Sequence, residues 1–168
     1  QNTILQSMNG LWKIWFHPSF IPNEGHYWPL TYTSLWLDYQ FWGMIPLGYH
    51  LMNLALHGVN SVLLFMILKR LRIPGAWLAS AIFALHPIHV ESVAWVIERK
   101  DVLSGCFYLL SVWMYLQFDD LGKKNKYYLS LFFFICAILS KSVPISLPLT
   151  LILYLWWRKE KIIKKEAI

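Results

Sequence analysis

The sequence predicts an all-α, polytopic membrane protein with about five transmembrane helices, and three observations support this class. Hydrophobic residues make up 57% of the 168-residue chain and charged residues 14%, whereas soluble domains carry roughly 25% charged residues. Apolar runs alternate with short charged or proline-containing stretches. Aromatic residues reach 17%, and ten of them are Trp, a side chain that favours the bilayer interface.

Residues 1–46 form the first predicted unit, a loop on the outer face of the membrane. Prolines and glycines interrupt this segment throughout, so it contains no uninterrupted run of about 20 apolar residues and no predicted span. Residues 10–16 and 30–42 are each expected to form a short amphipathic helix lying at the interface, where Trp rings can be half in water. The alternative is a soluble cap folded over the same face.

The second unit, residues 47–157, is predicted to be a transmembrane helical bundle. Its apolar runs cover residues 47–68, 75–85, 102–118, 127–139 and 143–157. Asp101 is a candidate N-cap for the third run. The second run covers only about 16 Å of helix, too short for a hydrocarbon core of about 30 Å. The hairpin that follows it is therefore expected to dip below the membrane surface and form a recessed polar pocket.

The loop charges predict the orientation. Eleven Lys and Arg residues fall on one side and four on the other; the four are Lys13, Arg99, Lys100 and Lys141. The richer side, which includes the basic segment 158–168, is expected to face the cytoplasm. Residues 1–46 and the hairpin 86–101 then share the outer face.

The hairpin concentrates the ionisable groups. It places His86, His89, Glu91 and Asp101 beside apolar runs, and polar groups in such a place indicate a functional site. A helix starting at Pro87 would put Glu91, Trp95 and Glu98 on one face. Imidazole and carboxylate can bind zinc, but the spacing matches no zinc signature, so no metal site is predicted.

A polar stripe runs along the first predicted span. His50, Asn53, His57 and Asn60 are spaced three, four and three apart, which places them on one helical face. His57 and Asn60 are expected to make interhelical hydrogen bonds. His50 and Asn53, nearer the outer end, are expected to line the pocket.

Arg99 and Lys100 make a cationic site on the side that is otherwise poor in basic residues. The planar guanidinium matches phosphate oxygens, so both residues are candidate phosphate ligands. The alternative is snorkelling to lipid headgroups. Asp101 could simply cap its helix, and Asp38 could be a surface residue or part of the pocket.

Several segments, in order, resemble one family. They are residues 28–40 (WPLTYTSLWLDYQ), 48–57 (GYHLMNLALH), 86–95 (HPIHVESVAW), 98–104 (ERKDVLS) and 139–144 (LSKSVP). Together they resemble the bacterial branch of the transmembrane and tetratricopeptide-repeat protein family. That family is similar to protein O-mannosyltransferases and belongs with the GT-C membrane glycosyltransferases.

The resemblance implies an integral, multi-pass enzyme, with the bacterial inner membrane as the expected location. It implies a polyprenyl-phosphate-linked sugar donor, a hydroxyl acceptor on a polypeptide at the outer face, and no nucleic-acid partner. No cofactor is assigned, and a divalent metal is left open. The family's catalytic carboxylate is expected upstream of Gln1, so no catalytic residue is assigned, and neither Glu24 nor Asp38 takes that role. The chain is expected to be a fragment, inactive by itself.

The rival hypothesis is a non-enzymatic membrane protein, such as a metal or ion permease that uses the His and Glu groups. A permease should carry polar residues at mid-depth in several spans. Residues 102–118 and 127–139 are almost wholly apolar, which favours a site at one face.

Overall fold

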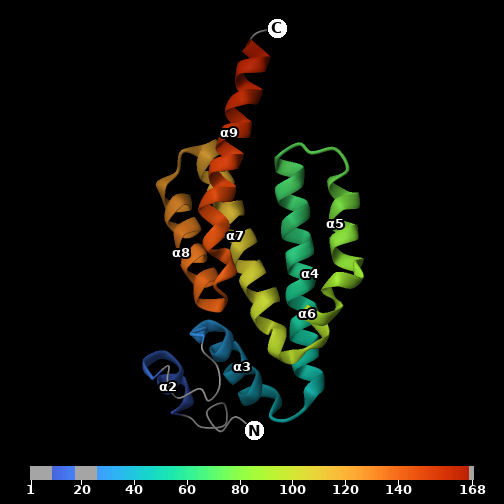
Figure 1. Cartoon of the computed structure of the whole chain (residues 1–168), viewed down its shortest axis with the longest axis vertical. Helices are drawn as coiled ribbons and strands as arrows, with labels where there is room; N and C mark the ends of the chain where they lie inside the picture. Colours follow the sequence, from blue (N-terminus) through green and yellow to red (C-terminus); the bar gives the residue numbers. More distant parts are fainter. Residues whose placement is uncertain (1–8, 18–25, 167–168) are drawn as a thin grey trace.

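The computed structural model describes residues 9–17 and 26–166, with side chains described as far as Arg158. Within these ranges the chain is almost entirely helical and contains no strand, so the all-α prediction is confirmed for them. Figure 1 shows the helices running roughly along one long axis, with α2, α3 and α6 gathered at one end.

Two short helices, α2 (Gly10–Phe16) and α3 (Pro29–Trp42), form where the sequence predicts them. Pro29 occupies the first turn of α3, where its missing N–H costs no hydrogen bond. Ile14 and Tyr32 are buried and pack with partly buried Trp residues, so the two helices form a packed unit. Their position at the membrane interface stays a prediction.

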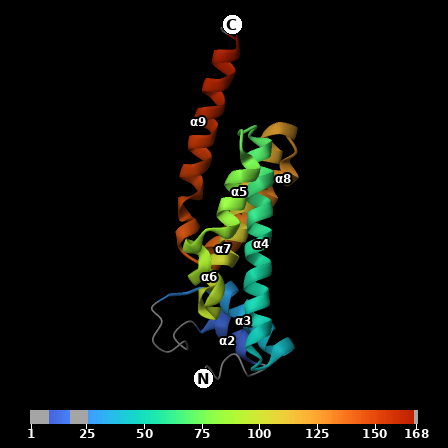
Figure 2. The ribbon, with the colours of Figure 1, turned by 90° about the vertical axis from the view of Figure 1, so that its right-hand side faces the viewer.

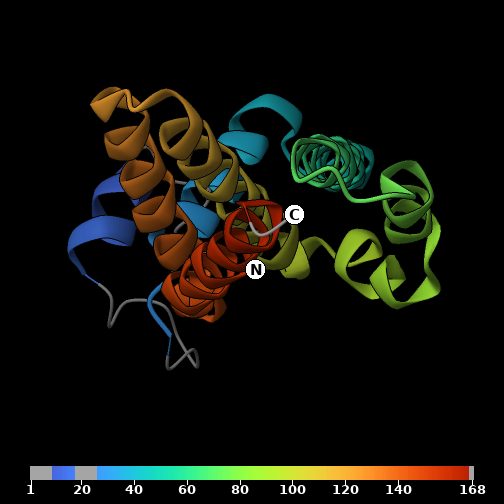
Figure 3. The same ribbon diagram turned by 90° about the horizontal axis from the view of Figure 1, so that it is seen from above.

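The next two helices, α4 (Pro46–Arg70) and α5 (Ala76–Leu85), lie side by side in Figures 1 and 3. The turn between them contains Gly75 in the left-handed region, with φ of 76°. Among the described helices, α4 alone has the length and apolar composition to cross a membrane. Crossing by the other four predicted spans stays a prediction.

The hairpin after α5 is broken into three pieces: η2 (Pro87–His89), α6 (Val90–Ala94) and η3 (Val96–Glu98). Trp95 separates the last two with an extended backbone, φ −89° and ψ 123°. The prediction of one helical face carrying Glu91, Trp95 and Glu98 is therefore wrong. At this break the carbonyls of Val93 and Trp95 accept hydrogen bonds from a side chain of α4.

The next two helices, α7 (Arg99–Leu121) and α8 (Lys124–Ser140), turn back on each other at Gly122. Ser111 and Ser130 each donate a hydroxyl to the other's carbonyl, both at 2.8 Å, so small residues allow close packing here. Asp101 is the third residue of α7 and is not its N-cap, which is Glu98. The cap prediction for Asp101 is wrong.

The last helix, α9 (Leu147–Glu166), follows a short turn, η4 (Val143–Ser146). Figure 2 shows α9 standing to one side of α4, α5 and α8, with its last turns extending beyond them. Leu149, Ile152 and Trp156 are each about 60% exposed.

The ends of the bundle gather the loops in two groups. The α4–α5 turn, the α7–α8 turn and the last turns of α9 lie at the end opposite α2, α3 and α6 (Figure 1). The loop charges predict that these two groups of loops lie on opposite sides of the membrane, and this stays a prediction. Which end faces the cytoplasm stays a prediction.

Candidate functional site

A buried arginine joins four segments near the α3 end of the bundle. Arg99 is 1% exposed, and its Nη2 donates to Asp38 Oδ2 at 2.6 Å and to the Tyr49 carbonyl at 3.1 Å. Its Nε donates to Asn53 Oδ1. The Asp38 side chain is only 5% exposed, so the ion pair is shielded from water on both sides.

Asn53 extends this network to the hairpin. It is fully buried, and its Nδ2 donates to the carbonyls of Val93 at 3.2 Å and Trp95 at 3.1 Å. The Asn53 side chain therefore accepts a hydrogen bond from Arg99 and donates hydrogen bonds to two backbone carbonyls of the hairpin. The result is a polar network that joins α3, α4, the hairpin and the start of α7. Asp38 is a member of this network, not a surface residue.

These contacts differ from the role expected for Arg99 and Lys100. The Arg99 guanidinium is engaged in protein hydrogen bonds and lines none of the three hollows described below. Lys100 Nζ pairs with Glu98 Oε1 at 3.1 Å and lies 5.2 Å from the centre of the Trp28 ring. Phosphate binding by either residue stays a prediction.

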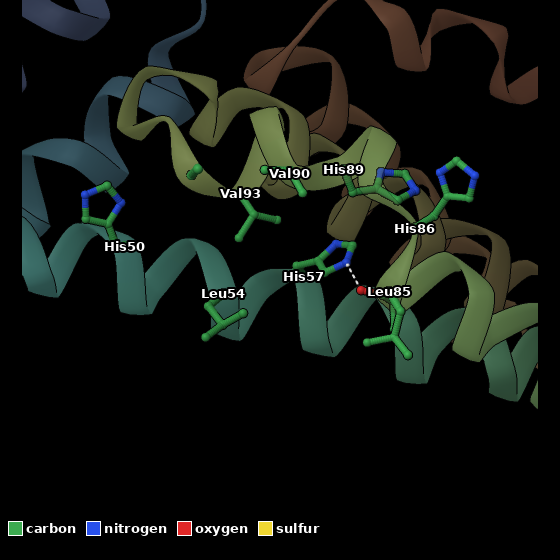
Figure 4. A pocket seen from close by; sticks show the side chains of 10 residues that line it. His50, Leu54, His57, Leu85, His86, His89, Val90 and Val93 are labelled. Carbon is green, nitrogen blue, oxygen red and sulfur yellow. Dashed lines mark hydrogen bonds between the residues drawn. The ribbon is translucent and has the colours of Figure 1, made fainter.

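The first hollow, here called the histidine hollow, has a volume of about 320 Å³. It lies between α4 and the segment from the end of α5 through α6, and Figure 4 shows side chains entering it from both walls. Its lining includes four histidines: His50, His57, His86 and His89. His50 and His86 are exposed at its mouth, whereas Asn53, the other residue expected here, lies in the buried network.

His57 and His89 face each other across the histidine hollow, with ring centres 5.3 Å apart (Figure 4). His57 Nε2 lies 3.1 Å from the Ala84 carbonyl. A carbonyl only accepts, so this nitrogen carries a hydrogen and donates it to Ala84. Partial burial, and then His57 and His86, lower the pKa of His89 below its ordinary 6.5. The His89 imidazole is therefore neutral at pH 7.

Asp101 and Lys141 form an ion pair at the junction of two further hollows. The first, of about 370 Å³, shares His57 and His89 with the histidine hollow. The second, of about 320 Å³, lies between α7 and η4 and contains Lys141. Both include Asp101, Gly105 and Tyr108 in their linings. The side chains of Asp101 and Lys141 are 28% and 25% exposed, so an incoming ligand can reach the pair.

Lys141 is the main residue that sequence reasoning missed. The sequence shows a lysine at the end of an apolar run on the side poor in basic residues, but nothing locates its partner 40 positions away. Glu91, in contrast, is exposed and lines none of the three hollows. The described residues contain no group of three or more His, Cys, Asp or Glu side chains placed to hold a metal ion. Glu24 lies outside the described residues.

Comparisons with known proteins identify the family. Residues 29–168 match the family model for dolichyl-phosphate-mannose-protein mannosyltransferase. Protein O-mannosyl-transferase Tmtc1 of Drosophila melanogaster is 35% identical over 74% of this chain and 15% of its own length. Protein O-mannosyl-transferase TMTC4 of Mus musculus is 33% identical over 82% of this chain and 22% of its own length. Protein O-mannosyl-transferase tmtc2 of Xenopus laevis is 42% identical over 54% of this chain and 11% of its own length.

No solved structure matches the chain. The chain spans less than a quarter of the length of these three relatives. The match to the family model nevertheless covers most of the 168 residues, including those of the buried network and of all three hollows. The chain therefore belongs to the dolichyl-phosphate-mannose-protein mannosyltransferase family.

Proposed function

We propose that this chain is part of an integral, multi-pass membrane glycosyltransferase that moves mannose from a polyprenyl-phosphate donor to a hydroxyl on a polypeptide. The observation that carries the proposal is the accessible Asp101–Lys141 pair at the junction of two hollows. Family membership supports the reaction class. Because of the distribution of loop charges, we propose that the reaction takes place on the outer face. Because the chain resembles the bacterial branch of the family, we propose that the protein lies in a bacterial inner membrane.

Lys141 is proposed to bind the donor phosphate. In the reaction the acceptor hydroxyl attacks the anomeric carbon, the sugar–phosphate bond breaks, and the phosphate leaves with the bonding electrons. Negative charge therefore grows on the phosphate, and a fixed cation nearby stabilises it most in the transition state. Lys141 is a partly exposed cation that lines the hollow between α7 and η4, and a phosphate would replace its Asp101 partner.

The histidine hollow is proposed to hold the sugar. The neutral His89 imidazole offers one donor and one acceptor, which suits the hydroxyl groups of a hexose. His57 and His89 line both the histidine hollow and the adjoining hollow with Asp101. A sugar held there would lie next to the proposed phosphate site. The group that deprotonates the acceptor is not assigned.

Arg99 is proposed to position this site and not to react. Its bonds to Asp38 and Asn53 hold the hairpin against α4, and the hairpin carries His86 and His89. Two residues after Arg99, Asp101 points toward Lys141 from the first turn of α7. Displacing the guanidinium would therefore move both walls of the proposed sugar site.

Mannose transfer by the full-length protein, with dolichyl-phosphate mannose and a Ser/Thr-containing acceptor, tests the proposal. We expect Lys141→Ala to lower kcat/KM about 100-fold, as expected for a lost charge contact to a leaving group. Lys141→Arg should restore part of this loss because it keeps the cation. The matched control is Lys123→Ala, which removes an exposed cation at the other end. A wild-type rate for folded Lys141→Ala would contradict the phosphate role.

A further inference from the structure

A fourth hollow lies at the end of the helices opposite the three described above. It has a volume of about 280 Å³ and is formed by the α4–α5 turn together with α7 and α9. Leu116, 2% exposed, lies among its lining residues. The polar lining includes Arg70, Arg72 and Arg158. The proposed transfer reaction makes no use of this hollow.

Two of these arginines are held by carboxylates of α7. Arg70 Nη2 lies 2.8 Å from Asp120 Oδ2. Arg158 pairs with Asp119 and also places its Nη2 3.1 Å from Asp120 Oδ1. These ion pairs join α4, α7 and α9 at this end. They fix two guanidinium groups around the hollow and neutralise most of their charge.

The third arginine is different, because no hydrogen bond or ion pair of the Arg72 side chain is found among the residues that the structure describes. Arg72 is exposed, and it lies in the left-handed backbone region with φ of 55°, which is uncommon for a residue other than glycine. Its N–H donates to the Lys69 carbonyl at 3.0 Å. The turn therefore holds Arg72 beside the hollow, and the charge there is left without a carboxylate.

We propose that this hollow binds a phosphate group, with Arg72 as its main ligand and Arg70 and Arg158 as flanking donors. Three arginines against two aspartates leave a net positive charge, and guanidinium groups match phosphate oxygens. Trp157 and Leu71 also line the hollow and can contact an acyl chain. A basic pocket between helices, at the membrane face richer in Lys and Arg, suits the headgroup of an anionic phospholipid.

The test compares two single-charge variants of the full-length protein in dodecyl maltoside. The probe is fluorescent phosphatidylglycerol, and its binding is followed by anisotropy. Arg72→Asn removes the proposed ligand, and Asn tolerates the left-handed backbone. Lys124→Asn is the matched control, because Lys124 is exposed at the same end and outside the hollow. Thermal stability of both variants checks that the fold is kept.

We expect Arg72→Asn to raise the Kd at least about tenfold, the loss of one charge-assisted phosphate contact. Lys124→Asn should raise it by less than about threefold. Equal losses in the two variants would show only diffuse attraction between a basic surface and an anionic lipid, and would overturn the proposal. An unchanged Kd for Arg72→Asn would do the same.

Two further probes distinguish the source of the phosphate. A fluorescent diacylglycerol without a phosphate should bind at least about tenfold more weakly than phosphatidylglycerol. Comparable binding would mean that the acyl chains alone are recognised, against the proposal. Inorganic phosphate that displaces the labelled lipid in wild type, and less well in Arg72→Asn, assigns the site to free phosphate as well. Displacement by unlabelled phosphatidylglycerol alone assigns it to the lipid headgroup.

Discussion

The buried Asp38–Arg99 pair should show strong coupling in a double-mutant cycle. At 2.6 Å and an effective dielectric constant of about 20, the attraction is about 6 kcal/mol before desolvation is subtracted. Desolvating two ions offsets much of this gain. A single substitution keeps the desolvation cost of the remaining ion and loses the attraction.

We therefore expect Asp38→Asn and Arg99→Met each to lower the free energy of unfolding by about 3 to 5 kcal/mol. Arg99→Met should be the more severe, because Asp38 then has no cation, whereas in Asp38→Asn the arginine still donates to Asn53 and the Tyr49 carbonyl. The double variant leaves no buried charge. It should cost at least about 2 kcal/mol less than the sum of the single variants.

The assay is unfolding of the full-length protein from mixed micelles by sodium dodecyl sulfate, followed by tryptophan fluorescence. The control cycle uses Arg70→Met and Asp120→Asn, whose side chains are 26% and 41% exposed. Their coupling should be about 1 kcal/mol or less. If the Asp38 and Arg99 effects simply add, with coupling no larger than the control, the central role of this pair is refuted.

Three other predictions concern packing, pH and orientation. Gly48→Ala should destabilise the protein, because the new Cβ would lie 2.3 Å from the Trp42 ring, whereas Gly58→Ala, with nothing within 4 Å, should be neutral or stabilising in thermal denaturation. Because the pKa of His89 is lowered in the folded protein, the unfolded chain binds the proton more readily, and the free energy of unfolding should fall as the pH drops through about 6.5. His89→Gln should remove part of this pH dependence when unfolding is measured across that range, and an unchanged pH dependence would contradict the prediction. A single cysteine at Asn125, in a cysteine-free background, should resist a membrane-impermeant reagent in intact cells and react after permeabilisation, whereas labelling in intact cells would reverse the orientation.

The helices could be predicted from the sequence because apolar runs and their breaking residues are local signals. Three glycines at helix ends have a positive φ: Gly43 follows α3, Gly75 precedes α5 and Gly122 follows α7. Pro29 and Pro46 occupy the first turns of α3 and α4. The break at Trp95 could not be predicted in this way. The break depends on Asn53 of α4, whose side-chain amide donates to two backbone carbonyls of the hairpin. The spacing of residues along the hairpin carries no information about a partner on another helix.

The site was predicted in part for the same reason. Polar groups beside apolar runs indicate a site, and the predicted pocket residues His50, His86 and His89 line one hollow. His57 lines it as well, although the sequence indicated only interhelical hydrogen bonding for this residue. Which charges meet is a matter of tertiary contact. Arg99 pairs with Asp38, which lies 61 positions earlier in the chain. From the sequence alone, an arginine on the side poor in basic residues is equally compatible with binding a phosphate and with a buried ion pair.

Photo-crosslinking would test the proposed site most directly. The full-length protein would be illuminated with a polyprenyl phosphate that carries a diazirine on the carbon next to the phosphate, and the labelled peptides would be mapped by mass spectrometry. We predict labelling within residues 98–108 and 139–146, which carry Asp101 and Lys141, with competition by unlabelled dolichyl-phosphate mannose. Labelling confined to residues 69–75 and 116–126, at the other end of the helices, would contradict the assignment.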